Sequence, residues 1–220
     1  MSERSAVLVM AYGTPRDLDD VEAYYTDIRH GRPPPPHLLH ELQERYRAIG
    51  GRSPLLEITR LQVRGIAQRV GVEGYVGQKH ASPFIRDAVA AMEESQVQRA
   101  VGIVLAPHFS SMSIGDYKRR ALRAAEEVGW KGRLDFVDSW HLEPGYIDFL
   151  ASEVALAVRS LPENARDDAV VLFTAHSLPE KILQGGDPYP RQLEETAEAV
   201  AGQAGLQRWE VAWQSAGRTD

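Results

Sequence analysis

Four histidines follow short apolar stretches of the sequence: His80, His108, His141 and His176. Ligands of parallel α/β sheets sit beyond the carboxyl ends of the strands, so these positions are candidates for a site. A neutral imidazole accepts protons and binds first-row metals near neutral pH. His176, which follows the apolar run from Val170 to Phe173, is the strongest candidate. Each of these histidines is equally compatible with the ordinary presence of polar residues where a buried strand emerges, and for His176 the alternative is a ring that is hydrogen-bonded to a loop carbonyl.

Two arginines are candidates for binding an acidic small molecule. Arg29 stands at the end of an expected helix, and Arg45 lies next to Tyr46 within another. The planar guanidinium matches the geometry of a carboxylate. Basic side chains near a helix C-terminus also complement the helix dipole, so Arg29 fits an ordinary surface role as well.

Composition limits the classes of function. The 220 residues include no cysteine, which excludes disulfides, thiolate metal sites, cysteine nucleophiles and a cysteine-held iron–sulfur cluster. Any metal must therefore bind to His, carboxylate or Tyr. The net charge of -6 argues against general nucleic-acid affinity. No apolar run approaches the ~20 residues of a membrane span, and the start lacks a signal peptide, so a cytoplasmic location is expected.

Short β-branched runs alternate with long amphipathic segments, which is typical of an α/β protein with parallel sheets flanked by helices. The helices expected from their apolar stripes follow Pro15, the Pro33–Pro36 run, Pro83 and Pro144. The stripes are Val21, Tyr24, Tyr25 and Ile28; Leu38, Leu42, Tyr46 and Ile49; Ile85, Ala88, Val89 and Met92; and Leu150, Val154, Ala157, Val158 and Leu161. The expected strands are Ala6–Tyr12, Gly74–Gln78, Ala100–Ala106, Leu134–Asp138, Ala169–Thr174 and Trp209–Trp213.

Two domains are expected, with limits at residues 1–143 and 144–220. The second would contain only two of the strands, and a sheet of that size rarely stands alone. Either the chain is a fragment or a partner completes it.

The sequence resembles the ferrochelatase family, closest to the coproporphyrin type of Gram-positive-type bacteria. The resemblance rests on Leu8–Pro15, Tyr24–Arg29, Arg45–Gly51 with Ser53–Leu55, Lys79–His80 with Pro83–Ile85, Leu105–Ser110, Ala175–Ile182, Gly186–Pro190 and Trp213–Ser215. These stretches occur in family order and together are highly specific. The resemblance implies two Rossmann-like domains, the second incomplete here, with the porphyrin in the cleft between them.

The implied activity is insertion of ferrous iron into coproporphyrin III during haem biosynthesis. Fe²⁺ would be a substrate, with no separate cofactor, no iron–sulfur cluster and no nucleic-acid partner; the oligomeric state stays open, with a monomer as one alternative. His176 matches the histidine that binds Fe²⁺ and accepts pyrrole protons, and Tyr12 matches the axial ligand of the product iron. His80 matches a second histidine considered in metal delivery. The residues that match porphyrin-binding positions, beside Tyr12, are Arg29, Arg45, Tyr46, Ser53 and Tyr117.

The resemblance has one gap. The family's His-x-x-Glu motif, whose glutamate partners the catalytic histidine, has no match in these residues. We therefore expect this chain to have much reduced or no activity. Two alternatives remain: a porphyrin- or haem-binding protein without turnover, and a chelatase for another metal or tetrapyrrole.

Overall fold

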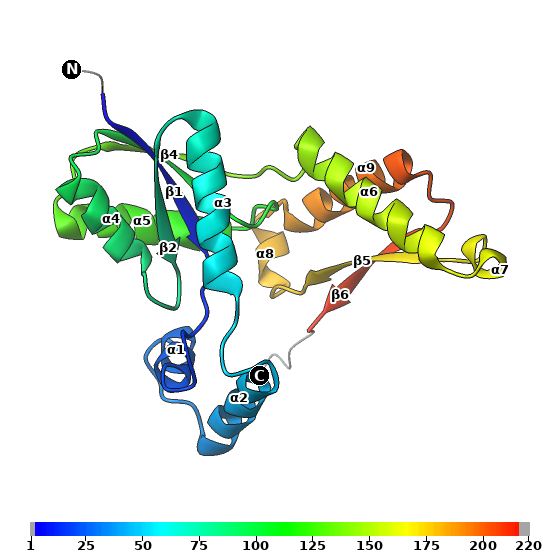
Figure 1. Ribbon diagram of the computed structural model, residues 1–220, viewed down its shortest axis with the longest axis horizontal. Coiled ribbons are helices and arrows are strands. Elements are labelled where there is room, and N and C mark those ends of the chain that lie inside the picture. The colour runs from blue at the N-terminus through cyan, green and yellow to red at the C-terminus, as the bar shows by residue number, and fades with distance from the viewer. Residues whose placement is uncertain (1–2, 216–220) are drawn as a thin grey trace. The chain divides into compact units, whose positions relative to one another are not determined.

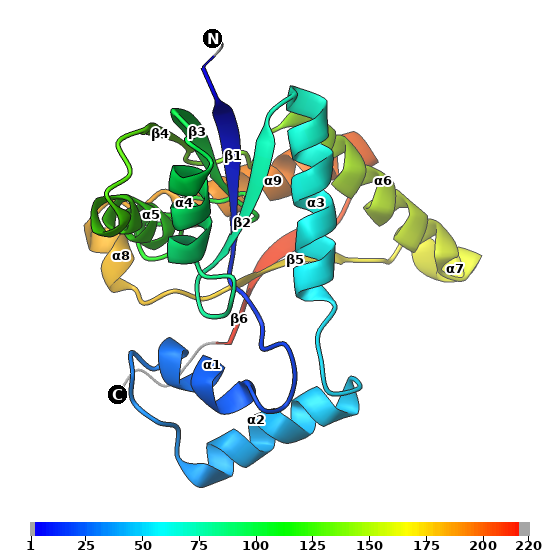
Figure 2. The same ribbon diagram turned by 60° about the vertical axis from the view of Figure 1, so that its left-hand side comes forward.

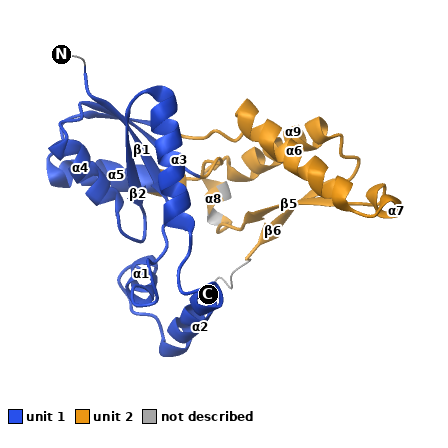
Figure 3. Ribbon diagram, viewed as in Figure 1, with its two compact units in different colours: residues 1–105, 117–137 blue, residues 106–116, 138–220 orange. Residues whose placement is uncertain are grey.

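The computed structural model describes residues 3–215, without the side chains of residues 181 and 183. It divides into two compact units, shown in different colours in Figure 3. Unit 1 contains Met1–Leu105 and Tyr117–Val137, and unit 2 contains Ala106–Asp116 and Asp138–Asp220.

A four-stranded parallel sheet forms the centre of unit 1, with strand order β2-β1-β3-β4 (Figure 1). Its strands are β1 Ser5–Ala11, β2 Glu73–Gln78, β3 Arg99–Val104 and β4 Arg133–Val137. The second strand in this order, β1, is buried from Ala6 to Ala11. A continuous apolar run is expected of a parallel strand that is covered on both faces.

Helices α3 Leu55–Val70 and α4 Ile85–Glu94 pack on this sheet. A Cβ added to Gly74 would lie 2.7 Å from Cγ1 of Val63 in α3, and one at Gly77 would lie 2.9 Å from Cα of Ile85 in α4. Positions three apart on a strand face opposite sides, so α3 and α4 cover opposite faces of the sheet. A third long helix of this unit, α5 Ile114–Val128, begins in the segment that groups with unit 2.

Two helices extend unit 1 beyond the carboxyl end of β1. They are α1 Val21–Ile28 and α2 Pro36–Ala48, which contact each other and lie side by side in Figures 1 and 2. After α2, Gly50 and Gly51 both have positive φ, as suits a helix C-terminus.

Unit 2 contains a two-stranded parallel sheet of β5 Val171–His176 and β6 Trp209–Gln214. The long helices α6 Pro144–Ser160 and α9 Tyr189–Ala204 pack together, and the short helices α7 Glu163–Arg166 and α8 Lys181–Gln184 complete the unit. Its core contains Ile147, Ala151 and Val200, with Phe173 of β5 packed against them. Alternate residues of β5 are exposed: Leu172, Thr174 and His176.

The structure confirms the α/β class, the six expected strands, each within about two residues, and the four expected helices. The stripe of α2 differs from the expectation, because no residue of α2 is fully buried and Ile49 lies past its end, 59% exposed. The end of one strand, β5, differs from the expectation in a way that affects the candidate site. β5 was expected to end at Thr174, but its pairing with β6 continues to His176, opposite Gln214. His176 is therefore the last residue of the strand, not the residue after it. In α6 the apolar side is shorter than expected, because Ala157 and Leu161 are exposed.

The segment 106–116 lies within the first of the two expected domains, whereas in the structure it groups with unit 2. The reason is a set of hydrogen bonds to the chain around α9. The backbone N–H of Phe109 donates to Gln192 (2.6 Å), and that of Ser111 donates to Asp187 (2.7 Å). Within residues 3–215, no helix combines the length and the apolar character needed to cross a bilayer. The cytoplasmic location stays a prediction.

Candidate functional site

The candidate residues divide between the two units. His176 belongs to unit 2, and the others belong to unit 1: Tyr12, Arg29, Arg45, Tyr46, Ser53 and Tyr117. Each group is held by contacts within its own unit.

Tyr12 directly follows β1, at the carboxyl end of the buried strand. Its side chain is 47% exposed, and one side of the ring faces the imidazole of His80, with the ring centroids 4.6 Å apart. Partial burial raises the pKa of Tyr12; the nearby Asp27 carboxylate acts in the same direction, and Arg120 opposes it. The phenol thus combines a supported ring with access to solvent, which suits a residue that contacts a ligand.

His80 is 5% exposed, and its Nδ1 lies 2.5 Å from Oδ1 of Asp27 in the last turn of α1. Burial lowers the pKa of His80, and the hydrogen bond to Asp27 opposes this shift. Its burial under Tyr12 and its bond to Asp27 favour a supporting role over the role in metal delivery implied by the resemblance. No role for Asp27 was predicted. A usable signal was its position three residues after Tyr24, which places both side chains on one face of the helix.

Tyr46 lies next to the segment that follows Tyr12. Its hydroxyl is 3.1 Å from Oγ1 of Thr14, which is 4% exposed. Burial and the neighbouring hydroxyl of Tyr46 raise the pKa of Tyr24, in α1. The structure thus brings Tyr46 to the same end of the sheet as Tyr12, and adds Thr14 and Tyr24, to which the sequence analysis gave no role.

The two arginines are held differently. The Nε of Arg29 is buried and has no hydrogen-bond partner in the described part of the chain, while its guanidinium lies 5.9 Å from the ring centroid of Tyr25. Arg45 is on the surface, with its side chain 71% exposed and an Nη2 atom 2.5 Å from Oε1 of Glu41. Exposed pairs of this kind contribute little stability, so a ligand carboxylate can replace Glu41 at small cost.

Ser53 and Tyr117 have structural contacts that the sequence did not indicate. Oγ of Ser53 accepts a hydrogen bond from the backbone N–H of Leu55, in the first turn of α3. The ring of Tyr117 is 5% exposed, and the ammonium of Lys79 lies 5.2 Å from its centroid. Tyr117 is therefore the least exposed of the candidate residues in unit 1.

In unit 2, His176 projects from the exposed face of β5. Its backbone carbonyl accepts a hydrogen bond from the hydroxyl of Tyr189 (3.2 Å). No hydrogen bond or ion pair joins its imidazole to another residue of the described chain. The ring therefore differs from those of the other three candidate histidines, which are all engaged.

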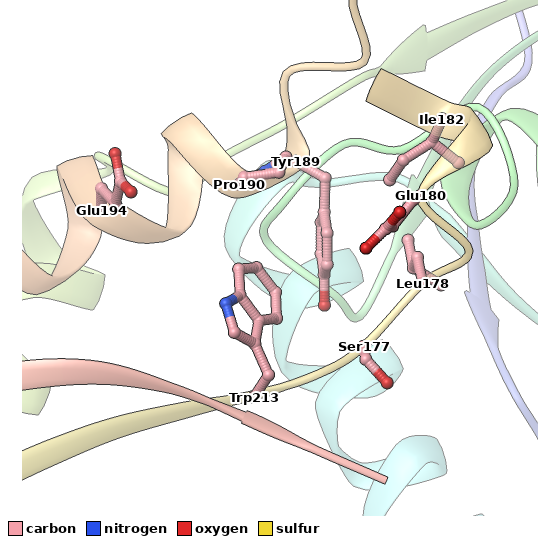
Figure 4. Close-up of a pocket in the computed structure, with 8 residues that line it drawn as sticks. All are labelled: Ser177, Leu178, Glu180, Ile182, Tyr189, Pro190, Glu194 and Trp213. Carbon is pink, nitrogen blue, oxygen red and sulfur yellow. The ribbon is translucent and has the colours of Figure 1, made fainter. Parts of the chain in front are cut away.

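A pocket of about 420 Å³ adjoins the end of β5. Figure 4 shows the ring of Tyr189 beside the indole of Trp213, with the carboxylate of Glu180 on the other side of Tyr189. The centroids of Tyr189 and Trp213 are 6.2 Å apart. The pocket is lined by Ser177, Leu178, Glu180, Ile182, Tyr189, Pro190, Glu194 and Trp213.

His108 and His141 are hydrogen-bonded to α9. Nε2 of His108 lies 2.9 Å from Oγ1 of Thr196, and Nε2 of His141 lies 2.8 Å from the carboxylate of Glu195. Burial lowers the pKa of His108 to about 4, and the neighbouring His141 adds to this shift. Both rings are thus hydrogen-bonded to side chains of α9. Within residues 3–215, no group of three or more His, Asp or Glu side chains is arranged to hold a metal ion.

Comparison with known proteins gives one consistent result. The ferrochelatase family model matches residues 4–219. The coproporphyrin III ferrochelatase of Geobacillus kaustophilus is 47% identical over 226 residues, which cover 100% of this chain and 71% of the relative. That of Geobacillus thermodenitrificans is 49% identical, covering 97% of this chain and 69% of the relative. The Bacillus subtilis protein of the same name is 45% identical, over a stretch that covers 99% of this chain and 72% of the relative. This chain belongs to the ferrochelatase family.

Proposed function

We propose that this chain binds coproporphyrin III and inserts Fe²⁺ into it. The observation that carries the proposal is its 44–49% identity to eight proteins named coproporphyrin III ferrochelatase. The structure adds chemistry that suits the reaction: an exposed phenol at the carboxyl end of β1 and an exposed imidazole at the carboxyl end of β5. Both are parallel strands, whose carboxyl ends are where α/β proteins bind ligands.

The reaction needs a proton acceptor and a metal ligand, and it involves no redox change. Fe²⁺ replaces two pyrrole N–H protons, so the charge of the metal balances that of the protons released. His176 is the residue we assign to Fe²⁺ and, once the metal has left its nitrogen for the porphyrin, to one pyrrole proton; the other proton is released to solvent water. We expect slow turnover by this chain, since useful affinity for a divalent metal generally requires several ligands.

The propionates of the porphyrin are assigned to the arginines of unit 1. The buried Nε of Arg29 has no hydrogen-bond acceptor among residues 3–215, and a propionate oxygen would supply one. Arg45 would release the carboxylate of Glu41 and form an ion pair with a propionate instead. Tyr46, Ser53 and Tyr117 complete the proposed set, and the phenol oxygen of Tyr12 is assigned to the iron of the product, a known form of haem ligation.

The test is a spectral titration of the chain with coproporphyrin III, followed by anaerobic addition of Fe²⁺. We expect saturable binding and then conversion to the spectrum of the iron complex, slower than for a Geobacillus relative. Parallel additions of Co²⁺ and Ni²⁺ test the metal preference. Binding without conversion would show a porphyrin-binding protein without turnover, and absence of binding would refute the proposal.

A further inference from the structure

Tyr12, His80 and Asp27 form a row of contacts in unit 1. We infer that Asp27, acting through His80, is a positioning residue that holds the phenol of Tyr12 in the orientation needed to meet bound iron. The inference rests on the proposed function, in which Tyr12 is a ligand of the product iron. It gives a role to a carboxylate that the sequence analysis did not consider.

The backbone of Tyr12 is already fixed against the segment that carries His80. The carbonyl of Tyr12 accepts from the backbone N–H of His80 (3.0 Å), and that of Ala11 accepts from Lys79 (2.9 Å). Gly13 has φ +96°, and a Cβ there would lie 3.1 Å from Cβ of Gln78 and 3.2 Å from the backbone N of Ala81. The main chain therefore has little freedom, and the direction of the phenol depends on the torsions of its own side chain.

The imidazole of His80 limits those torsions. The rings of Tyr12 and His80 are tilted by 57° at 4.6 Å, and His80 is almost fully buried while about half of Tyr12 is exposed. His80 thus forms a fixed wall on the inner side of the phenol. If the imidazole turned, the phenol would lose the surface that sets its direction.

Asp27 keeps the imidazole from turning. Its Oδ1 accepts from Nδ1 of His80 at 2.5 Å, and its side chain reaches His80 from a different element, α1. The other charged groups that influence His80 are Lys79 and Arg120, and an Nη1 atom of Arg120 donates to the carbonyl of Lys79 (3.2 Å). The partner of a ligand-bearing side chain commonly fixes its orientation, and a mispositioned phenol would form a poorer bond to iron.

The experiment compares Asp27→Leu with Asp27→Asn. Leucine removes the hydrogen-bond acceptor, whereas asparagine keeps an amide oxygen that can accept from Nδ1. Glu22→Leu is the matched control, because it removes an exposed carboxylate from the same helix without touching His80. Tyr12→Phe identifies the signals that belong to Tyr12.

Two readouts are used. In the ligand-free chain carrying ¹³C-labelled tyrosine, the ring signals of Tyr12 should shift in Asp27→Leu and stay near the wild-type position in Asp27→Asn and Glu22→Leu. With ferric coproporphyrin III, the phenolate-to-iron absorption band should be lost or displaced in Asp27→Leu and restored in Asp27→Asn. Binding of metal-free coproporphyrin III should not change, and this separates positioning from general damage to the fold.

Failure of the inference and failure of the proposed function give different results. Unshifted Tyr12 signals in Asp27→Leu would overturn the inference, whether or not porphyrin binds. The inference would also be overturned if the phenolate-to-iron absorption band is abolished by Tyr12→Phe but is unaffected by Asp27→Leu. If wild type does not bind ferric coproporphyrin III, or if Tyr12→Phe leaves its band unchanged, the assignment of Tyr12 to iron is wrong and the inference falls with it.

Discussion

Nε2 of His108 lies 2.9 Å from Oγ1 of Thr196, a residue 88 positions later in the chain. The hydroxyl of Thr196 also lies 3.0 Å from the carbonyl oxygens of His141 and of Gln192, and either carbonyl can accept its single proton. When a carbonyl accepts the proton of Thr196, Nε2 of His108 donates to Oγ1 of Thr196, and the lowered pKa of His108 keeps the ring neutral. This contact joins the segment after β3 to α9, so the charge state of one half-buried imidazole affects the stability of unit 2.

We predict that the free energy of unfolding falls as the pH is lowered from 6.5 to about 4. The pKa of His108 is lowered from 6.5 to about 4 in the folded chain, so the unfolded chain binds more protons throughout this window. The stability that the neutral ring contributes is complete above pH 6.5 and is lost as the pH falls through 4. A shift of this size corresponds to at most about 3 kcal/mol. Urea unfolding at a series of pH values measures it.

The comparison variant is His108→Gln, which keeps a side-chain N–H donor and cannot titrate. Its free energy of unfolding should depend less on pH between 4 and 6.5 than that of wild type. Burial raises the pKa of the Asp187 carboxyl, but hydrogen bonds donated by Ser111, Tyr189 and Ser110 outweigh it and lower the pKa overall. The stability that this carboxylate contributes is lost at lower pH, and this loss is common to both proteins. Parallel curves for the two proteins would contradict the assignment.

Close packing of α3 on the sheet leads to a second prediction. Gly74→Ala should destabilise the chain by about 1–3 kcal/mol, since the added Cβ would overlap Val63 and Ala67. Gly65→Ala is the matched control on α3 itself, where a Cβ meets nothing within 4 Å. It should stabilise the chain by roughly 0.5–1 kcal/mol, because alanine is the better helix former. Equal effects of the two substitutions in urea unfolding would show that α3 does not approach β2 this closely.

The sequence predicted the strands well because short apolar, β-branched runs mark them by local composition alone. Contacts between residues that are far apart in the chain could not be predicted from the sequence. The bond between His80 and Asp27 depends on where α1 lies relative to the end of β2, 53 residues away in sequence. Likewise, the structural roles of His108 and His141 depend on α9, which no expected stripe represented. His176 was displaced from loop to strand because the pairing with β6, not the apolar run, decides where β5 ends.

A third prediction concerns Arg29. Arg29→Met keeps most of the side-chain length and removes the charge, so coproporphyrin III should bind about 10–100-fold more weakly, as expected for a lost hydrogen bond to a charged group of about 1.5–3 kcal/mol. Fluorescence quenching of coproporphyrin III measures the affinity. Arg69→Met, at an exposed position in the last turn of α3, should leave it unchanged.

The methyl ester of coproporphyrin III separates charge from shape in this measurement. It lacks carboxylates, so the difference between wild type and Arg29→Met should disappear with the ester. Added salt should weaken the binding of the acidic porphyrin more than the binding of the ester, because salt screens the attraction between charges. A difference that persists with the ester would mean that Arg29 acts through packing on Tyr25 and not through a propionate.

The last prediction separates metal insertion from porphyrin binding. His176→Ala should abolish the conversion of bound coproporphyrin III by Fe²⁺, while the affinity for the metal-free porphyrin stays within about twofold. The reason is that the imidazole of His176 is exposed and unengaged in the described chain, so its removal disturbs no contact of unit 2. The same anaerobic titration measures both quantities in one sample.

His40→Ala is the control, because it removes another exposed imidazole, on α2, that has only a 4.0 Å contact with Glu44. It should convert porphyrin at the wild-type rate. If His176→Ala instead lost porphyrin binding and kept its rate of metal insertion per bound porphyrin, His176 would be a binding residue. The proton acceptor would then have to be sought elsewhere, and the carboxylate of Glu180, which lines the pocket beside β5, would be the next group to test.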